Sequence, residues 1–250
     1  MKENYGFKKY DKILIPPSER LISVVKHYGW KEENIIKMNL PRWDNYNDNN
    51  QKKEYVKNKN IFVMFTWRRI KKKKSISELY FENINGLLNN NLLLKSLKKY
   101  NVTLYLTFHH KINNISKIKI KINKNIKYIK EEEISYILTN TSLIVTDFSS
   151  IIFDMIYREK PFIIFIPDSN DPSIDDIYSS HYSHLIKDIK GGTIPLQNTF
   201  FSIEDTVKKI YYYMKNNFNL EPKLKLFYKN FGFKKQKNTN KFIEYLKKLK

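Results

Sequence analysis

Apolar positions along the chain fall into short runs that alternate with stretches of amphipathic, helical spacing. The short runs predict strands over residues 12–16, 61–65, 102–108, 126–129, 143–145 and 162–166. The amphipathic stretches predict helices over residues 18–28, 75–100, 132–139 and 203–216. Strands and helices that alternate in this way predict a parallel sheet with helices on both faces, as in Rossmann-like α/β folds.

The segment 143–168 has the most informative pattern of the chain. A buried strand leads into a polar turn, TDFSS at 146–150, and then into a helix that carries Asp154. A strand that ends in hydroxyl residues at a helix start is expected to offer hydroxyls and free backbone N–H groups to an anion. In an open α/β sheet this position is the carboxyl edge, where ligands bind. The segment therefore predicts a phosphate site.

The charge of the chain changes this picture little. Lys and Arg total 46 against 25 Asp and Glu, which gives a net charge of +21. Such an excess is typical of proteins that bind nucleic acid or anionic lipid. Here Lys, Asn and Ile are abundant throughout the chain, and Lys and Asn also dominate the polar segment 45–60. Lys greatly outnumbers Arg, the residue that base recognition favours. We therefore expect no nucleic-acid partner, and an attraction to an anionic substrate or membrane surface stays open.

Cysteine usage and hydropathy bear on the compartment. With no Cys, the chain has no disulfide, no thiolate metal site and no Cys nucleophile, which fits the cytoplasm. No run of about 18 apolar residues is present, and the first residues lack the apolar core of a signal peptide. We expect a cytoplasmic protein that is at most peripheral to the inner face of the cell membrane. The basic tail 221–250 predicts one or two helices, either packed on the surface or inserted into the membrane interface.

Four separated pieces of the sequence share one known pattern: LPRWD at 40–44, FTWRR at 65–69, His109-His110, and TDFSS with IIFD and KP between 146 and 161. Together they resemble the CDP-glycerol glycerophosphotransferase family of teichoic-acid polymerases and primases. The resemblance covers roughly residues 10–215. It implies the C-terminal, nucleotide-donor domain of a GT-B type enzyme.

The resemblance further implies transfer of glycerol phosphate, or a related polyol phosphate, from a CDP-activated donor to a hydroxyl of a lipid-linked or cell-surface glycan acceptor. Such a reaction belongs to teichoic-acid or capsule synthesis. The implied domains are an interdomain segment or remnant of an N-terminal domain (1–50), a nucleotide-donor domain (51–220) and a basic helical tail (221–250).

The chain also departs from the family pattern. Members carry a further N-terminal domain with a His-Gly-Thr-Pro type motif, which is absent here, and His27 lies in a predicted helix. Phe65 stands where Pro is frequent, Leu40 where Gly is common, and Phe148 in place of Tyr. We therefore expect a donor half, with the acceptor's base supplied by a missing domain or a partner chain, or lost.

The histidine pair gives the catalytic candidates. His109 follows the strand 102–108 and is expected at the carboxyl edge. An imidazole with a pKa near 6.5 can donate to the diphosphate or protonate departing CMP. The strand count favours His109 as the family's position, and a shift of one residue would exchange it with His110.

Arginine gives two binding candidates. Arg68 follows the strand 61–65 and matches the family's arginine, where a guanidinium suits a bidentate grip on phosphate. Its neighbour Arg69 is expected to face solvent. Arg42 is a second candidate, with a salt bridge to Asp44 as the alternative.

The turn gives the other binding candidates. Ser149 and Ser150 are expected to contact the diphosphate, with ordinary helix capping as the alternative. Thr146 is an additional candidate ligand. Asp154 either hydrogen-bonds the ribose or cytosine or holds the serine turn in place. Asp147 is expected to accept hydrogen bonds from backbone N–H groups, a structural role.

No metal and no cofactor is expected beyond the nucleotide-activated substrate. Asp175, Asp176, His181 and His184 have ligand chemistry, but their surroundings are typical of an exposed polar loop. Two other functions stay open. One is a GT-B glycosyltransferase that uses a CMP- or UDP-sugar, and the other is an inactive fragment that only binds nucleotide.

Overall fold

The computed structural model describes residues 11–27, 29–46, 59–66, 78–108, 119, 123–147, 149–167, 196–233 and 239–248. The chain forms two compact units. The first, here called the sheet unit, comprises Lys52–Met155 and Lys160–Glu221. The second, the discontinuous unit, comprises Met1–Gln51, Ile156–Glu159 and Pro222–Lys250.

A six-stranded, wholly parallel sheet forms the centre of the sheet unit. Its strands are β3 (Asn60–Phe65), β4 (Thr103–Phe108), β5 (Ile126–Tyr128), β6 (Leu143–Thr146), β7 (Phe162–Phe165) and β8 (Thr199–Phe200). Their order across the sheet is β5-β4-β3-β6-β7-β8. This is the doubly wound Rossmann order, whose direction of winding reverses between β3 and β6. The predicted fold class is confirmed.

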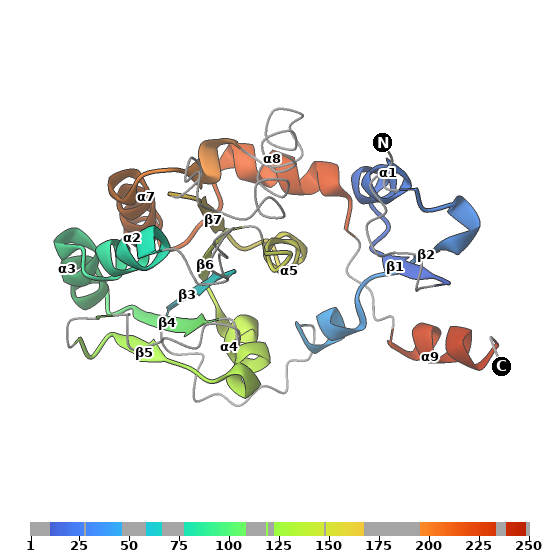
Figure 1. Cartoon of the computed structure of the whole chain (residues 1–250), viewed down its shortest axis with the longest axis horizontal. Helices are drawn as coiled ribbons and strands as arrows, with labels where there is room; N and C mark the ends of the chain where they lie inside the picture. Colours follow the sequence, from blue (N-terminus) through green and yellow to red (C-terminus); the bar gives the residue numbers. More distant parts are fainter. Residues whose placement is uncertain are drawn as a thin grey trace. The chain divides into compact units, whose positions relative to one another are not determined.

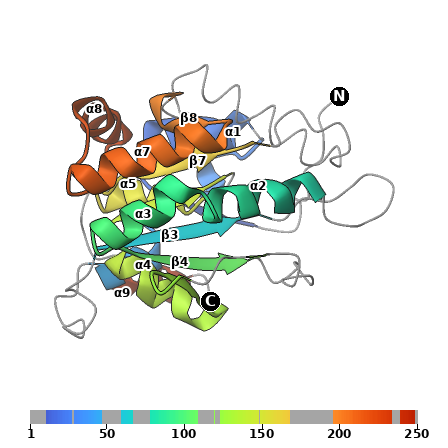
Figure 2. The same ribbon diagram turned by 90° about the vertical axis from the view of Figure 1, so that its left-hand side faces the viewer.

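Helices cover both faces of this sheet, as Figures 1 and 2 show. On one face lie α2 (Glu78–Leu88), α3 (Asn91–Lys99) and α7 (Ile203–Lys215). On the other lie α4 (Ile134–Asn140), which follows the 3-10 helix η6 (Glu131–Glu133), and α5 (Ile152–Tyr157). The strands are apolar on both sides because each side meets a helix layer: Ile61 and Val63 point to one layer, and Phe62 is equally buried.

One predicted helix needs correction, and two short strands, residues 35–37 and β8, were not predicted. In place of a single helix over 75–100, the described residues form two, α2 and α3. Asn90 divides them because its side chain accepts hydrogen bonds from the N–H groups of Leu92 (2.9 Å) and Leu93 (3.3 Å) and so begins a new helix. Strand β8 follows the 3-10 helix η7 (Leu196–Asn198) and, with two residues, is too short to show alternation.

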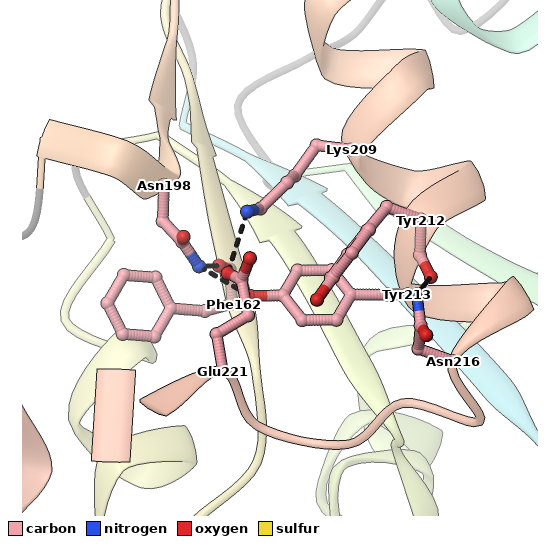
Figure 3. A network of polar contacts seen from close by, with 7 residues as sticks. All are labelled: Phe162, Asn198, Lys209, Tyr212, Tyr213, Asn216 and Glu221. Atoms are coloured by element: carbon pink, nitrogen blue, oxygen red, sulfur yellow. Dashed lines mark hydrogen bonds and ion pairs between the residues drawn. The ribbon is translucent and has the colours of Figure 1, made fainter. Parts of the chain in front are cut away.

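A buried hydrogen-bonded cluster lies at the amino-terminal end of β7 (Figure 3). The Asn198 amide donates to the carbonyl of Phe162 (2.6 Å) and to the hydroxyl of Tyr213 (2.9 Å). The Glu221 carboxylate accepts from that hydroxyl (3.1 Å) and from the Lys209 ammonium (2.7 Å). Burial raises the pKa of the Tyr213 hydroxyl. We call Asn198, Lys209, Tyr213 and Glu221 the α7 cluster.

The discontinuous unit joins segments from both ends of the sequence. Its elements are β1 (Ile13–Ile15), α1 (Glu19–His27), η2 (Glu32–Asn34), β2 (Ile35–Lys37), η3 (Pro41–Tyr46), α8 (Pro222–Phe231) and α9 (Thr239–Lys247). Strands β1 and β2 pair in parallel. Trp43 is fully buried and stacks on Tyr157, with ring centroids 4.4 Å apart. The Asp44 carboxylate accepts from both the N–H (2.8 Å) and the hydroxyl (2.6 Å) of Thr239, 195 positions away.

Candidate functional site

The carboxyl ends of three neighbouring strands bring the sequence motifs to one edge of the sheet. Phe65 of β3 pairs with Phe108 of β4, and Met64 of β3 pairs with Thr146 of β6. This edge includes the point between β3 and β6 where the winding reverses, the usual place for a ligand in such a sheet. Phe108 directly precedes His109, one of the motif positions.

Of the predicted arginine and histidine residues, Arg68 and both histidines lie outside the described residues. Thr66 is described and stands two positions before Arg68 in the sequence. Arg68, His109 and His110 fall in segments that the structure does not describe, so their roles stay predictions.

A buried cluster ties the ends of β3 and β6 together. The Asp147 carboxylate, 1% exposed, accepts from the Thr66 N–H (3.0 and 3.1 Å to its two oxygens) and from the Thr66 hydroxyl (2.9 Å). The Thr146 hydroxyl donates to the carbonyl of Met64 (2.6 Å). We call Met64, Thr66, Thr146 and Asp147 the strand-end cluster. It joins the second and fourth sequence motifs, which lie 81 positions apart.

These contacts refine two predictions. Asp147 does accept from a backbone N–H, as expected, but the donor belongs to Thr66 at the end of β3. Thr146 was expected as a ligand, yet it is fully buried and its hydroxyl bonds within the sheet. A Thr hydroxyl has one proton to donate, and the Thr146 hydroxyl donates it to the Met64 carbonyl and not to an anion.

The serine turn differs from its expected form. The N–H groups of Ile152, Phe153 and Asp154 donate to the carbonyls of residues 149–151, at 3.4, 3.0 and 3.1 Å. The expectation of free N–H groups at this helix start is therefore wrong for these three, because the first turn is wound tightly enough to use them. Helix α5 also has only six residues, which limits its dipole.

The groups of this turn that can bind an anion are chiefly the hydroxyls of Ser149 and Ser150. The Ser149 hydroxyl accepts a long hydrogen bond from the N–H of Ile151 (3.4 Å) and keeps its own proton to donate. Ser150 is exposed, and its hydroxyl forms no hydrogen bond with the described residues. Ser150 is thus the described candidate that is best placed to meet a solvent-borne phosphate.

The remaining predicted ligands are placed as follows. Asp154 is 1% exposed on α5, and this burial favours the interpretation that it holds the turn in place. Arg42 is exposed on η3 of the discontinuous unit. Because the Asp44 carboxylate receives the two donors of Thr239, it already has partners other than Arg42. The role of Arg42 stays a prediction.

An asparagine pair that sequence reasoning missed binds the backbone of Lys119. Asn85 of α2 accepts from the Lys119 N–H (2.7 Å), and Asn89 donates to the Lys119 carbonyl (2.6 Å). Two amides four positions apart lie on the same face of a helix, so both can reach one residue. Their spacing is the available sequence signal, but Asn is so abundant in this chain that the spacing does not stand out.

Neither a metal-binding cluster nor a membrane-spanning helix occurs within the described ranges. No group of three or more His, Asp or Glu residues is close enough there to hold a metal ion. Asp175, Asp176, His181 and His184 lie outside those ranges. None of the described helices combines the length and the apolar character that crossing a bilayer requires.

Comparison with known proteins gives consistent relatives. The family model described as CDP-Glycerol:Poly(glycerophosphate) glycerophosphotransferase matches residues 1–246. The minor teichoic acid biosynthesis protein GgaB of Bacillus subtilis (strain 168) is 27% identical over 240 residues, which cover 88% of this chain and 24% of GgaB.

Solved structures show the same fold at low identity. The wall teichoic acid polymerase TagF superposes with a TM-score of 0.61 at 19% identity, over 96% of this chain and 57% of TagF. A TagF variant soaked with CDPG gives a TM-score of 0.58 at 16% identity, over 96% of this chain and 56% of that one. UDP-GlcNAc 2-epimerase from Neisseria meningitidis, bound to UDP-GlcNAc, gives 0.50 at 15% identity, over 93% and 60%. The chain thus spans about a quarter of GgaB and just over half of TagF.

Proposed function

Because the chain belongs to the CDP-glycerol:poly(glycerophosphate) glycerophosphotransferase family, we propose that it supplies the donor site for transfer of glycerol phosphate, or a related polyol phosphate, from a CDP-activated compound. The relatives named for teichoic acid synthesis support this proposal, as does the TagF variant soaked with CDPG. The product would be a teichoic-acid-like or capsular polymer.

One observation supports a specific location for the donor site. Thr66 and Asp147, from two different motifs of the family pattern, are hydrogen-bonded at the carboxyl edge between β3 and β6. Nucleotides bind at this reversal point in doubly wound sheets. The exposed Ser150 hydroxyl follows three positions after Asp147. We place the diphosphate of the donor here, in reach of Ser149 and Ser150.

The reaction needs positive charge and hydrogen-bond donors at the phosphates. An acceptor oxygen forms a bond to the β-phosphorus, the bond from that phosphorus to the bridging oxygen breaks, and CMP departs with that oxygen. Charge grows on the departing phosphate, so donors aimed at it lower the barrier. Arg68 is proposed to grip the diphosphate, and His109, with His110 as the alternative, to donate a proton to CMP.

The acceptor side of the reaction lies beyond these residues. The acceptor is proposed to be a hydroxyl of a lipid-linked or glycan polymer, whose proton goes to a base in a further domain or a partner chain. Such a division of labour agrees with the fraction of GgaB and TagF that this chain matches.

The test is a calorimetric titration of the purified chain with CDP-glycerol, CMP-sialic acid and UDP-glucose. We expect saturable binding of CDP-glycerol and an affinity about tenfold lower in Ser150→Ala, since a hydrogen bond to a charged phosphate contributes about 1.5 kcal/mol. Ser135→Ala is the matched control, because Ser135 is an exposed serine of α4. Binding of UDP-glucose alone would assign the site to a sugar nucleotide and refute the proposed donor. Absence of any binding would refute both the proposed donor and an inactive fragment that only binds nucleotide.

A contact with the inner membrane surface is the second part of the proposal. Residues 221–250 contain ten lysines and two glutamates, and α9 exposes Ile243 (44%) and Leu246 (46%). A basic helix with exposed apolar side chains suits an anionic interface. Sedimentation with phosphatidylglycerol–phosphatidylcholine vesicles should show binding that Leu246→Asp weakens. Leu92→Asp, at an equally exposed leucine of α3, is the control, and equal binding of both variants and the wild type would contradict the contact.

A further inference from the structure

We infer that Asp147 is a positioning residue of the donor site and acts through Thr66, an inference that rests on the proposed function. Asp147 is 1% exposed, so its carboxylate is shielded from solvent. It accepts the N–H of Thr66 at 3.0 and 3.1 Å and the hydroxyl of Thr66 at 2.9 Å. Two donors of a single residue therefore converge on one buried carboxylate.

Because the Asp147 carboxylate is buried, its contact with Thr66 restricts the conformation of Thr66. A carboxylate that is withdrawn from water loses its hydration and must regain hydrogen bonds from the protein. Hydrogen bonds to a charged acceptor are shorter and stronger than neutral ones. Because Thr66 provides a backbone and a side-chain donor together, both its φ/ψ and its rotamer are constrained. The contact fixes the conformation of Thr66 as well as its location.

The place of the contact gives it a consequence for the site. Met64 and Thr146 are the last paired residues of β3 and β6, and the contact joins the residues just beyond them. Thr66 stands two positions before Arg68, and Asp147 stands two before Ser149. The contact therefore fixes the points at which both proposed phosphate-binding segments leave the sheet.

Asp147 is not itself proposed to touch the donor. A carboxylate would repel the diphosphate, and this one is already occupied by Thr66. Its effect would be geometric, because a bidentate contact from Arg68 depends on the position of the arginine backbone. A misplacement of about 1 Å can lower the rate of a reaction by as much as 100-fold. A residue with only a structural role would lower the stability of the fold but leave the donor affinity of the folded protein unchanged.

The test measures the affinity for CDP-glycerol by calorimetry in folded variants of the full chain. We expect Asp147→Asn and Thr66→Val each to weaken binding on the order of tenfold. The double variant should lose less affinity than the sum of the two single effects, because both substitutions weaken the same contact. Thr66→Ser retains both the N–H and a hydroxyl donor and should bind CDP-glycerol with the wild-type affinity.

A double-mutant cycle with Arg68 tests whether the contact between Thr66 and Asp147 acts through that arginine. Arg68→Ala should weaken binding, and in that background Asp147→Asn should have no further effect. Asp205→Asn is the matched control, since Asp205 accepts a hydroxyl hydrogen bond from Ser202 (2.8 Å) at the start of α7 in the same unit. We expect it to bind CDP-glycerol like the wild type.

The outcomes separate the two claims. If the wild type does not bind CDP-glycerol, the proposed function fails, and the inference with it. If the wild type binds and Arg68→Ala binds less tightly, but folded Asp147→Asn and Thr66→Val bind normally, the inference alone is overturned. The inference is also overturned if the effects of Asp147→Asn and Arg68→Ala simply add, or if Arg68→Ala has no effect. Thr66→Val, which removes only a hydroxyl, keeps the test decisive if the Asp147 variant does not fold.

Discussion

Two carboxylates of the sheet unit, the buried Asp147 and the partly exposed Glu221, are hydrogen-bonded near opposite ends of its strands. Asp147, in the strand-end cluster, accepts from Thr66 at the carboxyl edge between β3 and β6. Glu221, in the α7 cluster, accepts from Lys209 and Tyr213 near the amino end of β7 (Figure 3). Both are satisfied by short hydrogen bonds, so bond geometry alone does not distinguish them.

Their surroundings distinguish them. Thr66, Thr146 and Asp147 of the strand-end cluster are motif residues, and the chain leaves the cluster toward the proposed phosphate ligands. No motif marks the α7 cluster, whose Tyr213 belongs to the apolar core. We therefore expect a hydrogen-bonded carboxylate to affect donor binding only where it positions residues of the donor site. The variants that follow should separate an effect on binding from an effect on stability.

The largest effect is expected for Glu221→Ala. The variant leaves the Lys209 ammonium, whose side chain is 15% exposed, and the Tyr213 hydroxyl without their acceptor. Urea unfolding should show a loss of about 2–3 kcal/mol, below that of a fully buried pair because some solvent reaches both partners. The affinity of the folded variant for CDP-glycerol should stay unchanged. Glu204→Ala, at an exposed position of α7, is the control, and a weaker affinity in Glu221→Ala would break the comparison.

A smaller effect is expected for Thr146→Val, which tests the strand-end cluster itself. The substitution keeps the shape and removes the hydrogen bond to Met64, so the free energy of unfolding should fall by about 1–2 kcal/mol. Thr107→Val removes an equivalent buried bond, from Thr107 to the carbonyl of Ile129 (3.1 Å), and should cost a similar amount. Neither should alter the CDP-glycerol affinity. Weaker binding by Thr146→Val alone would restore Thr146 as a ligand.

Next in size is Tyr213→Phe. It removes one hydroxyl but leaves Asn198 bonded to Phe162 and Glu221 bonded to Lys209, so a loss of about 1 kcal/mol is expected. Tyr212→Phe is the neighbouring control, 40% exposed, and should change stability by less than about 0.5 kcal/mol. Equal losses in the two variants would show that the α7 cluster does not stabilise the fold.

The smallest effect is a difference in pH dependence. Burial raises the pKa of the Tyr213 hydroxyl above the ordinary tyrosine value near 10, so the folded state favours the neutral form. This contribution to stability is fully present below about pH 10 and declines as the pH rises toward the folded pKa. The stability difference between wild type and Tyr213→Phe should therefore narrow above pH 10. A stability difference that stays constant above pH 10 would contradict this prediction.

The sequence predicted the elements of the fold better than the contacts between them. Strands β3, β4, β6 and β7 were expected because buried strands of a parallel sheet have continuous apolar runs. The break at Asn90 was missed because a capping residue inside an asparagine-rich run resembles its neighbours. Strand β8 was missed because two residues cannot show a period.

At the site, sequence reasoning found the motif residues but not how they meet. Asp147 was expected to bind backbone N–H groups, yet nothing local indicates that its donor is Thr66, 81 positions away. That pairing depends on the strand order, which places β6 next to β3. Free N–H groups were expected after Ser150, but the tightness of the turn depends on how α5 packs and not on its composition.

The contact of Asp44 with Thr239 has a consequence for how the molecule is made. All residues of the sheet unit are synthesised before helices α8 and α9. Asp44 therefore precedes the residue that satisfies its carboxylate by nearly the whole length of the chain. Until α9 is made, the discontinuous unit lacks this contact and cannot reach its final form.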